Sequence, residues 1–459
     1  MTYDLIVIGG GPAGYVGAIR AAQLGKKVAC VENDRAGGTC LNWGCIPTKA
    51  LLKNAELYHT IAHRAEEFGL KVEGLSYDWS KVIGRSRKVS DKLCGGIEFL
   101  FKKNKVDYIR GTGSITAPGK VEVTAKDEKK ETHDAAKILV ATGAKARPMP
   151  GLPFNGQTVV DSHAAMILEK QPKSIAIIGA GAIGVEFAYF FNAYGTKVTL
   201  IEMMPRILPV EDEEASALVE KSFKKAGIRV LTKTKVASTK DHGDKISLTV
   251  EGGANETIEA DVCLVAIGVM PVLPGGIELK LTERGWLNTN ANYETSTKDI
   301  FGAGDIIGPP WLAHVASYEA VQCVEGLFKP GHKPKKVTTF PGCTYCQPQV
   351  ASIGLTETQA KEKNLKFKVG KFPYQASGKA LAVAEPEGFV KILFGEPHGE
   401  IIGAHIVGSE ATELIAELGL AMTLEATMDE IEATIHAHPT LAEMLKEATE
   451  VAEGHPIHV

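Results

Sequence analysis

The sequence lacks the charge excess and the cysteine content of two specialised classes of protein. Its 51 Lys and Arg face 55 Asp and Glu, which leaves a net charge of −4, whereas a nucleic-acid binder usually needs a basic surface to neutralise phosphates. It has 8 Cys in 459 residues, most of them scattered, too few for a disulfide-built scaffold and typical of buried thiols in a reducing compartment. We expect no nucleic-acid partner.

Long uninterrupted hydrophobic runs are also absent. The most membrane-like stretch, SIAIIGAGAIGVEFAYFF at 174–191, is interrupted by three glycines and Glu186, which is typical of a buried strand, turn and helix. The N-terminal MTYDLIVIGGG carries Asp4 and no basic leader, so we expect no signal peptide. We therefore expect no membrane span, and a location in the cytosol or, after removal of a leader, in a matrix-like compartment.

The clearest feature that is present is an internal repeat. DLIVIGGGPAG at 4–14 returns as SIAIIGAGAIG at 174–184, each a β-branched strand followed by G-x-G-x-x-G and a helical pattern. Each block continues through a second strand that ends in an acid 23 residues after the first glycine. The matched positions, 170 residues apart, are Gly9, Gly11, Gly14 and Glu32, and Gly179, Gly181, Gly184 and Glu202.

Each position of this fingerprint has a physical reason. The first glycine permits a tight turn, the second lets the backbone approach a pyrophosphate, and the third lets the helix pack against the strand. The pyrophosphate then lies on the unpaired N–H groups of the helix N-terminus, and the acid accepts hydrogen bonds from ribose hydroxyls. Two complete copies predict two bound dinucleotides.

The second copy also predicts the choice of cofactor. Glu202 favours NAD over NADP, because a carboxylate accepts from a free 2′-OH and repels a 2′-phosphate. Arg206, four residues on, could pair with such a phosphate, but the acid lies at the strand end itself.

Three more strands end at glycine turns. KILVATGAKARPMPG at 137–151 and VCLVAIGVMPVLPG at 262–275 carry prolines that indicate crossings between domains, and KDIFGAGDIIG at 298–308 holds Asp305. From about residue 340 the pattern changes to strands and a helical tail without a nucleotide fingerprint. This last region predicts an α+β domain.

The stretch GGTCLNWGCIPTKALLK at 37–53 contains Cys40 and Cys45. A metal site would need further ligands, and none lies nearby with metal-like spacing. CTYC could complete a four-cysteine zinc site on paper, but we expect its Cys343 and Cys346 to be buried structural thiols.

The spacing of Cys40 and Cys45 favours a reactive disulfide. Five helical residues rise about 7.5 Å, whereas bridged Cα atoms lie within about 7 Å. A bond between them needs a distorted turn, which makes it easier to reduce and suits a catalyst. Pro47 is well tolerated in a first helical turn, which would leave Cys45 at a helix N-terminus, where a thiolate is stabilised.

Dithiol exchange also needs a group that handles protons. Of the 13 histidines, His438 in HAHPTLAE is favoured because Pro439 fixes the turn after it. Glu443 follows five residues on, where it can orient and stabilise an imidazolium. His436 ranks below His438 because it does not precede the proline.

The order of these signals along the whole chain resembles the flavoprotein disulfide reductases, and most closely their dihydrolipoamide dehydrogenase branch. The motifs that carry the resemblance are GGTCLNWGCIPTKALL, ATGAKARP, GAGAIGVEFA, FGAGDIIG and HAHPTLAE. It implies an α/β fold with two Rossmann-like dinucleotide-binding domains, for FAD and NAD, and a C-terminal α+β dimerisation domain. The implied ranges are 1–146 for FAD, 147–271 for NAD, 272–340 for a central segment completing the FAD region, and 341–459 for the interface domain.

The resemblance also implies how the cofactors are held. The first glycine loop with Glu32 would bind the ADP part of FAD, and Asp305 would contact its ribityl chain. The second loop with Glu202 would bind the nicotinamide dinucleotide. Further cofactor-binding positions implied by the family are Thr142, Gly143 and Gly268.

By the same resemblance, Lys49 and Glu186 would lie beside the flavin N5. His438 and Glu443 would reach across a two-fold axis into the partner's active site, which implies a homodimer. In the implied reaction a dihydrolipoamide thiolate attacks Cys40, and Cys45 passes the electrons through FAD to NAD⁺. The implied partners are lipoyl domains of 2-oxo-acid dehydrogenase or glycine cleavage complexes.

Several alternatives stay open. Glutathione- and trypanothione-type reductases use NADPH and generally have a tyrosine near the second glycine loop, where this chain has Ala182 and Ile183. Mercuric and thioredoxin reductases carry reactive residues at the C-terminus, whereas no Cys follows Cys346. A flavin-bearing scaffold without turnover would have little reason to keep the predicted redox pair and His438 together.

Overall fold

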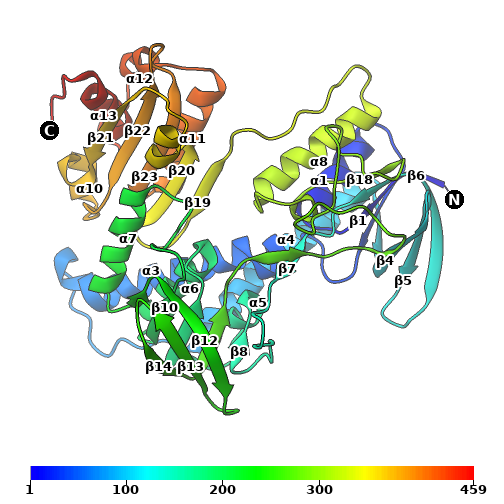
Figure 1. Ribbon diagram of the computed structural model, residues 1–459, viewed down its shortest axis with the longest axis horizontal. Coiled ribbons are helices and arrows are strands. Elements are labelled where there is room, and N and C mark those ends of the chain that lie inside the picture. The colour runs from blue at the N-terminus through cyan, green and yellow to red at the C-terminus, as the bar shows by residue number, and fades with distance from the viewer. Residues whose placement is uncertain (1) are drawn as a thin grey trace.

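The computed structural model describes residues 2–459, which fold into three units, each built on a large β-sheet (Figure 1). The first two units have mainly parallel sheets flanked by helices, and the third has an antiparallel sheet. This arrangement confirms the expected fold class, and the domain boundaries given above stay a prediction.

The first unit has an eight-stranded sheet in the order β17-β4-β5-β6-β1-β2-β3, with β18 also paired to β6. Its strands are β1 (Thr2–Ile8), β2 (Val28–Glu32), β3 (Asp107–Arg110), β4 (Thr112–Ala117), β5 (Lys120–Thr124), β6 (Lys130–Val140), β17 (Gly275–Gly276) and β18 (Ile300–Gly302). Its helices are α1 (Pro12–Gln23), α2 (Gly38–Trp43), α3 (Cys45–Arg64), η1 (Ala65–Phe68), α4 (Trp79–Lys103), η2 (Asp305–Ile307) and α8 (Ala313–Phe328). The segment predicted to complete the FAD region thus contributes β17 and β18 to this sheet.

The second unit has a parallel sheet in the order β11-β10-β9-β15-β8 and a separate antiparallel meander, β12-β13-β14. Its strands are β8 (Val159–Val160), β9 (Ser174–Ile178), β10 (Lys197–Ile201), β11 (Arg229–Leu231), β12 (Thr234–Asp241), β13 (Ile246–Gly252), β14 (Glu256–Ala260) and β15 (Val262–Val265). Its helices are α5 (Ser162–Ala165), α6 (Ala182–Ala193) and α7 (Glu213–Lys225). The two crossing segments pair with each other as β7 (Ala144–Ala146) and β16 (Val269–Pro271).

The third unit has an antiparallel sheet in the order β19-β20-β23-β22-β21. Its strands are β19 (Pro341–Thr344), β20 (Gln349–Gly354), β21 (Phe367–Pro373), β22 (Phe389–Gly395) and β23 (Ile401–Gly408). Its helices are α9 (Glu357–Glu362), η3 (Tyr374–Ala376), α10 (Gly378–Ala382), α11 (Ala411–Thr423), α12 (Met428–Ala433) and α13 (Glu443–Glu453). Helix α7 of the second unit lies between that unit and this sheet (Figure 1).

The sequence repeat extends to the backbone hydrogen bonds. β1 pairs in parallel with β2 and β6, and β9 pairs in parallel with β10 and β15. The first glycine of each loop donates to the residue just before the acid of the same block: Gly9 N–H to Val31 O and Gly179 N–H to Ile201 O, both at 2.8 Å. Buried β-branched runs of this kind suit strands that are covered on both faces.

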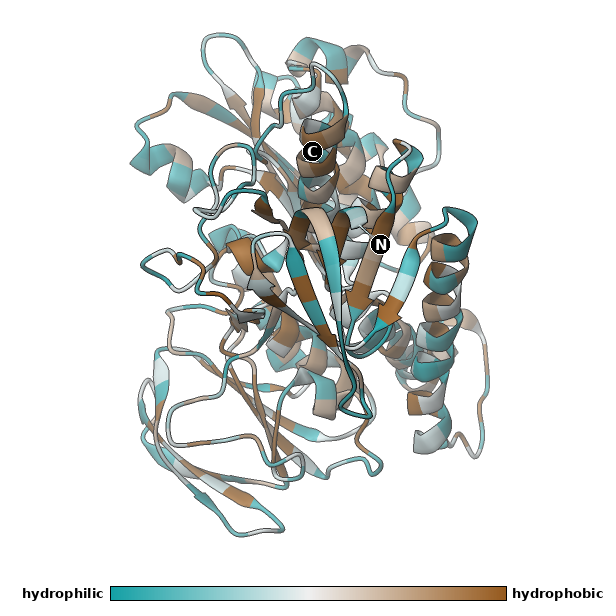
Figure 2. Cartoon of the chain, turned by 90° about the vertical axis from the view of Figure 1, so that its right-hand side faces the viewer, coloured by the Kyte–Doolittle hydropathy of each residue, from teal (hydrophilic) through white to brown (hydrophobic). Residues whose placement is uncertain are grey.

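One hydrophobic core joins the units. Leu51 and Leu52 of α3 pack in the same buried cluster as Phe187 and Phe190 of α6, and Val350 of the third unit belongs to it as well. Helix α3 is therefore held from both nucleotide-type units. Hydrophobic residues gather in the central strands, whereas loops and outward helix faces are largely hydrophilic (Figure 2).

A membrane-spanning helix must be long and apolar, and the sequence predicts none. Within residues 2–459, no helix is both long and apolar enough to cross a membrane.

Candidate active site

The two glycine loops have the shape of pyrophosphate cradles. A Cβ on the first or third glycine of either loop would collide with a backbone carbonyl oxygen, whereas the middle glycines face open space. Gly11 has only the Cα of Gly38 within 4 Å of such a Cβ, at 3.8 Å, and Gly181 has nothing. Both middle glycines are helix N-caps without a side-chain hydrogen bond. The space and the free helix N-terminal N–H groups fit a pyrophosphate on each loop.

The two acids occupy equivalent places behind these loops. Glu32 accepts hydrogen bonds from the N–H groups of Gly10 (2.6 Å) and Asp34 (2.8 Å). Glu202 accepts from Ala180 (2.7 Å) and Met204 (2.8 Å). Burial raises the pKa of Glu32, and its backbone hydrogen bonds oppose that rise. Each carboxylate thus fixes its loop and keeps acceptor positions for a ribose.

Arg206 is the residue that could pair with the 2′-phosphate of NADP, but it already forms an ion pair. Its guanidinium lies 3.0 Å from a carboxylate oxygen of Glu213, at the start of α7. The first turn of α6 carries Ala182 and Ile183, and Ile183 is exposed. The second loop thus presents one buried carboxylate and an arginine already neutralised by an acid.

The remaining predicted cofactor residues lie at strand ends of the first unit and at the crossings. Asp305 begins η2 directly after Gly304, and burial raises the pKa of its carboxyl to about 6. The Thr142 hydroxyl donates to Val272 O at 2.5 Å, which ties the two crossing segments together. The other two positions in this set adopt positive φ, Gly143 at 68° and Gly268 at 103°.

The chain between the two candidate redox cysteines is broken in the way their spacing requires. Cys40 lies in α2 and Cys45 is the first residue of α3, with Gly44 between the helices at φ −146° and ψ −113°. A Cβ at Gly44 would lie 3.1 Å from Thr39 O, so a side chain there would be crowded. This non-helical residue brings the two thiols together.

The two thiols have opposite acid–base character. The eight cysteines, all within residues 2–459, are unbridged, and Cys40 hydrogen-bonds to Cys45. That hydrogen bond lowers the pKa of Cys45, and the charge of Lys49 lowers it further. The same hydrogen bond, together with burial, raises the pKa of Cys40. The pKa of Cys45 is therefore the lower of the two, which is the direction that a position at a helix N-terminus favours.

Lys49 and Glu186 form an ion pair beside these thiols. Lys49 Nζ lies 2.9 Å from both carboxylate oxygens of Glu186, which joins α3 to α6 of the second unit. Sequence reasoning missed a third member: Tyr345 N–H donates to Glu186 at 2.9 Å, and its ring lies 4.3 Å from Lys49 Nζ. No local signal marks Tyr345, because its contacts are to residues more than 150 positions away.

A second missed group holds the loop between the cysteines. Trp43 stacks on His163 of α5 with ring centroids 3.8 Å apart, and its indole N–H donates to Asp34 at 2.6 Å. Arg87 of α4 lies over the same indole and donates to Asn42 O at 2.7 Å. The redox segment is thus fixed from α4 and from the second unit.

His438 and Glu443 pair with each other but not with the thiols. His438 Nδ1 lies 2.9 Å from Glu443, and the imidazole is 81% exposed. Burial acts to raise the pKa of Glu443, but hydrogen bonds from Thr440 N–H and His438 hold it below its usual value. Within residues 2–459 of one chain, no hydrogen bond or ion pair joins His438 to the redox cysteines. His436, by contrast, is nearly buried and bonds to Glu417 at 2.8 Å.

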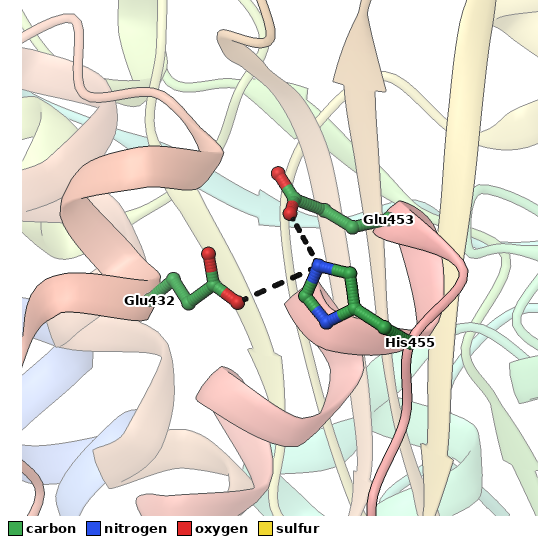
Figure 3. A group of neighbouring side chains, drawn as sticks. All are labelled: Glu432, Glu453 and His455. Atoms are coloured by element: carbon green, nitrogen blue, oxygen red, sulfur yellow. Dashed lines mark hydrogen bonds and ion pairs between the residues drawn. The ribbon is translucent and has the colours of Figure 1, made fainter.

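The expected burial of the CTYC cysteines is confirmed for Cys346, whereas Cys343 is only partly buried. Cys346 is fully buried and donates to Pro348 O at 3.1 Å, and burial raises the pKa of Cys343 to about 11. Among residues 2–459, the one group spaced to hold a metal is Glu432, Glu453 and His455 (Figure 3). These side chains already pair, since His455 Nε2 lies 2.8 Å from Glu453 and 3.8 Å from Glu432. The sequence-based expectation of no metal stays a prediction.

Comparisons with known proteins cover nearly the whole chain. The family described as pyridine nucleotide-disulphide oxidoreductase matches residues 3–320, and its dimerisation domain matches residues 340–449. A dihydrolipoyl dehydrogenase of Rhizobium etli is 44% identical over 99% of this chain and 98% of its own length, and one of Bacillus subtilis is 42% identical over 99% of each. The crystal structure of LpdA from Mycobacterium tuberculosis superposes with a TM-score of 0.90 at 26% identity, over 97% of this chain and 99% of that one.

Proposed function

The chain belongs to the pyridine nucleotide-disulphide oxidoreductase family, and we propose that it is a dihydrolipoyl dehydrogenase that oxidises dihydrolipoamide with NAD⁺. It is similar over nearly its full length to several enzymes of that name. The family uses FAD and NAD, and the two glycine loops fit one dinucleotide each.

The observation that carries the proposal is the arrangement of the two thiols. Cys45 begins α3, accepts the hydrogen bond of Cys40, and has Lys49 one helical turn further on. Cys45 is therefore held as the thiolate, and Cys40 is the sulfur that exchanges with a substrate thiol. Because the two thiols differ in this way, the disulfide between them can be broken and formed again in a defined order.

In the proposed exchange step the two sulfurs act in turn. His438 takes a proton from a dihydrolipoamide thiol, with Glu443 stabilising the imidazolium. The substrate thiolate attacks Cys40 Sγ, and the Cys40–Cys45 bond breaks so that Cys45 leaves as the thiolate. The second substrate thiol then displaces Cys40 Sγ, which forms the lipoamide disulfide and leaves the protein dithiol.

Bound FAD would supply the carrier that takes the electron pair from this dithiol and gives it to NAD⁺. In the chain, Glu32 and Asp305 would hold it, and Lys49 with Glu186 would border its reactive edge. Glu202 would bind the ribose of NAD⁺.

Since His438 does not meet the redox pair of its own chain, we propose that it serves the pair of a second copy in a homodimer. The matched dimerisation domain supports this arrangement. The proposed partners are lipoyl domains of 2-oxo-acid dehydrogenase or glycine cleavage complexes. The proposed location is the cytosol or a matrix-like compartment, which agrees with Cys30, Cys263 and Cys323 lying in the buried cores.

An anaerobic titration of the FAD-loaded protein with dihydrolipoamide tests the function. We expect a long-wavelength absorption band from the Cys45 thiolate beside the flavin, which Cys45→Ser abolishes. Cys40→Ser is the matched control, because it keeps Cys45 and should keep such a band while losing turnover. Lipoamide turnover in Cys45→Ser at the wild-type rate would contradict the proposal.

A glutathione-type reductase that uses NADPH is the second candidate. The ion pair between Arg206 and Glu213 and the carboxylate of Glu202 favour NAD instead. Parallel assays of NADH and NADPH with lipoamide and with glutathione disulfide separate the two.

A further inference from the structure

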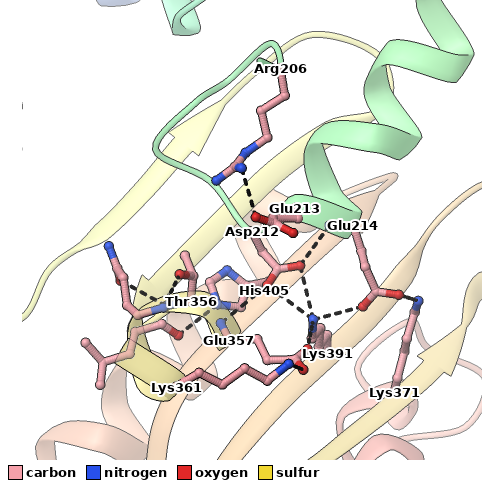
Figure 4. A network of polar contacts seen from close by, with 12 residues as sticks. Arg206, Asp212, Glu213, Glu214, Thr356, Glu357, Lys361, Lys371, Lys391 and His405 are labelled. Atoms are coloured by element: carbon pink, nitrogen blue, oxygen red, sulfur yellow. Dashed lines mark hydrogen bonds and ion pairs between the residues drawn. The ribbon is translucent and has the colours of Figure 1, made fainter. Parts of the chain in front are cut away.

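Lys391 is a buried charge that the reaction above does not use. It lies on β22, near the start of α7 (Figure 4), and its side chain is 1% exposed. Three carboxylates surround its ammonium: Asp212 at 3.2 Å, Glu214 at 2.8 Å and Glu357 at 2.6 Å. A buried ammonium is tolerated only when it is well paired, and removal of its partners is strongly destabilising. No local sequence motif marks this cluster.

The cluster joins two units of the molecule. Asp212 and Glu214 lie at the start of α7 in the second unit, whereas Glu357 and Lys391 belong to the third. Outside it, Lys371 pairs with Glu214, and Lys361 pairs with Glu357 at 2.6 Å. Three lysines thus balance three acids across the contact.

From Asp212 a short path leads to the second glycine loop. Residues 203–212 follow Glu202 and end at Asp212, and we name them the 203–212 loop. Leu208 N–H in this loop donates to Ala180 O of the glycine loop at 2.8 Å. At its end, Asp212 caps α7 by accepting Glu214 N–H at 3.1 Å, so Asp212 holds both the helix and Lys391.

The 203–212 loop is only partly held by burial, so the contacts at its end contribute to fixing it. Ile207 and Leu208 are buried, but Met203 and Val210 are 69% and 80% exposed. The exposed part near Glu202 lies where an NAD adenosine ribose would bind, because Met204 N–H is one of the two donors to Glu202.

We propose that Lys391 is a positioning residue for NAD. By holding Asp212 it fixes the end of the 203–212 loop and, through Leu208, the second glycine loop against the dimerisation domain. This rests on the proposed use of NAD by that loop. Loss of the contact should weaken NADH binding without changing the rate of the chemical step.

The double variant Asp212→Asn with Lys391→Met tests this, because it removes one charge of each sign and Asn still caps α7. NADH is the probe, and reduction of the flavin in FAD-loaded protein is followed by stopped flow. We expect half-saturation to rise about fivefold or more, the lower end of a typical coupling between sites. The rate at saturating NADH and the single-turnover reduction by dihydrolipoamide should stay within about twofold of wild type.

Lys361→Met is the matched control, because Lys361 pairs with the same Glu357 but is 66% exposed. It should leave half-saturation unchanged. An unchanged half-saturation in the double variant, with normal FAD content, would overturn the proposal, as would an equal rise in Lys361→Met.

If the double variant does not retain FAD, Glu357→Gln decides: a rise of about twofold in half-saturation supports the role of Lys391, and no rise overturns it. Failure of dihydrolipoamide to reduce the wild-type flavin would contradict the proposed function alone, since the NADH measurement does not use it.

Discussion

The two glycine loops make equivalent hydrogen bonds but differ in how closely the rest of the chain surrounds them. At the first loop, a Cβ on Gly38 would lie 2.5 Å from the Cα of Gly11, so the chain covers that loop closely. At the second, nothing lies within 4 Å of a Cβ on Gly181, and Ile183 beside it is 41% exposed. The enclosed loop suits a resident cofactor, and the open loop suits one that enters and leaves in each turnover.

The cover of the first loop is also the redox segment. Gly38 begins α2, which carries Cys40, and its φ of 57° is one that glycine adopts without strain. The same few residues therefore close the enclosed site and deliver the thiols to it. At the second loop the equivalent hydrogen bond comes from Leu208 N–H to Ala180 O, but nothing there lies as close to Gly181 as Gly38 lies to Gly11.

The largest effect should come from the third glycine of each loop. Gly14→Ala and Gly184→Ala each place a Cβ against the carbonyl oxygen of the first glycine in the same loop, so the loop must shift. We expect Gly14→Ala to lose FAD, and Gly184→Ala to keep FAD while NADH-driven flavin reduction falls at least about a hundredfold. Absorbance and stopped flow measure these changes. Loss of FAD in both variants would break the comparison.

A smaller effect is expected at Asp305, whose carboxyl is partly buried beside the enclosed loop. Burial raises the pKa of Asp305 from 3.8 to about 6, so its stabilising contribution is full below pH 3.8 and is lost as pH rises through about 6. Asp305→Asn should therefore stabilise FAD-free protein by about 2 kcal/mol at pH 8 and change it little near pH 4. Thermal unfolding at both pH values checks this, and FAD retention should fall. A gain that is equal at both pH values would contradict it.

Substitution of Glu202 and of Glu32 should affect different cofactors, NADH and FAD respectively. In Glu202→Gln one of the two backbone N–H groups, Ala180 or Met204, loses its acceptor along with the charge. We expect half-saturation by NADH to rise about tenfold and discrimination against NADPH to narrow, with FAD content unchanged. The matched Glu32→Gln should lower FAD retention instead. The outcome that counts against this is a change in FAD content in Glu202→Gln.

The smallest effect concerns the support that the open site receives from the third unit. Hydrogen bonds from Lys361 and Lys391 lower the pKa of Glu357 from 4.5 to about 2. The stabilisation is present above pH 4.5 and is lost as pH falls through about 2. Glu357→Gln should cost about 1 kcal/mol at pH 7, because Glu357 is partly exposed, and the cost should shrink toward pH 3. A difference in melting temperature that does not change with pH would contradict this.

Much of the site could be predicted because its signals are local. A G-x-G-x-x-G turn, an acid at the end of the next strand and a cysteine ahead of Pro47 depend on residues a few positions apart, where backbone geometry leaves few solutions. The break at Gly44 follows in the same way from the distance between two thiols. His438 and Glu443 pair as predicted within their own chain, but their meeting with the redox cysteines stays a prediction.

The sequence by itself determined the two dinucleotide fingerprints and the family, and it predicted which two cysteines form the redox pair. Only the tertiary structure decided which loop is enclosed, which tyrosine supports Lys49 and Glu186, and how Lys391 joins two units. The physical reason is that these contacts bring together residues from distant parts of the chain, such as Glu186 with Tyr345 and Asp212 with Lys391. Their formation depends on how helices and sheets pack, and no local spacing records that packing.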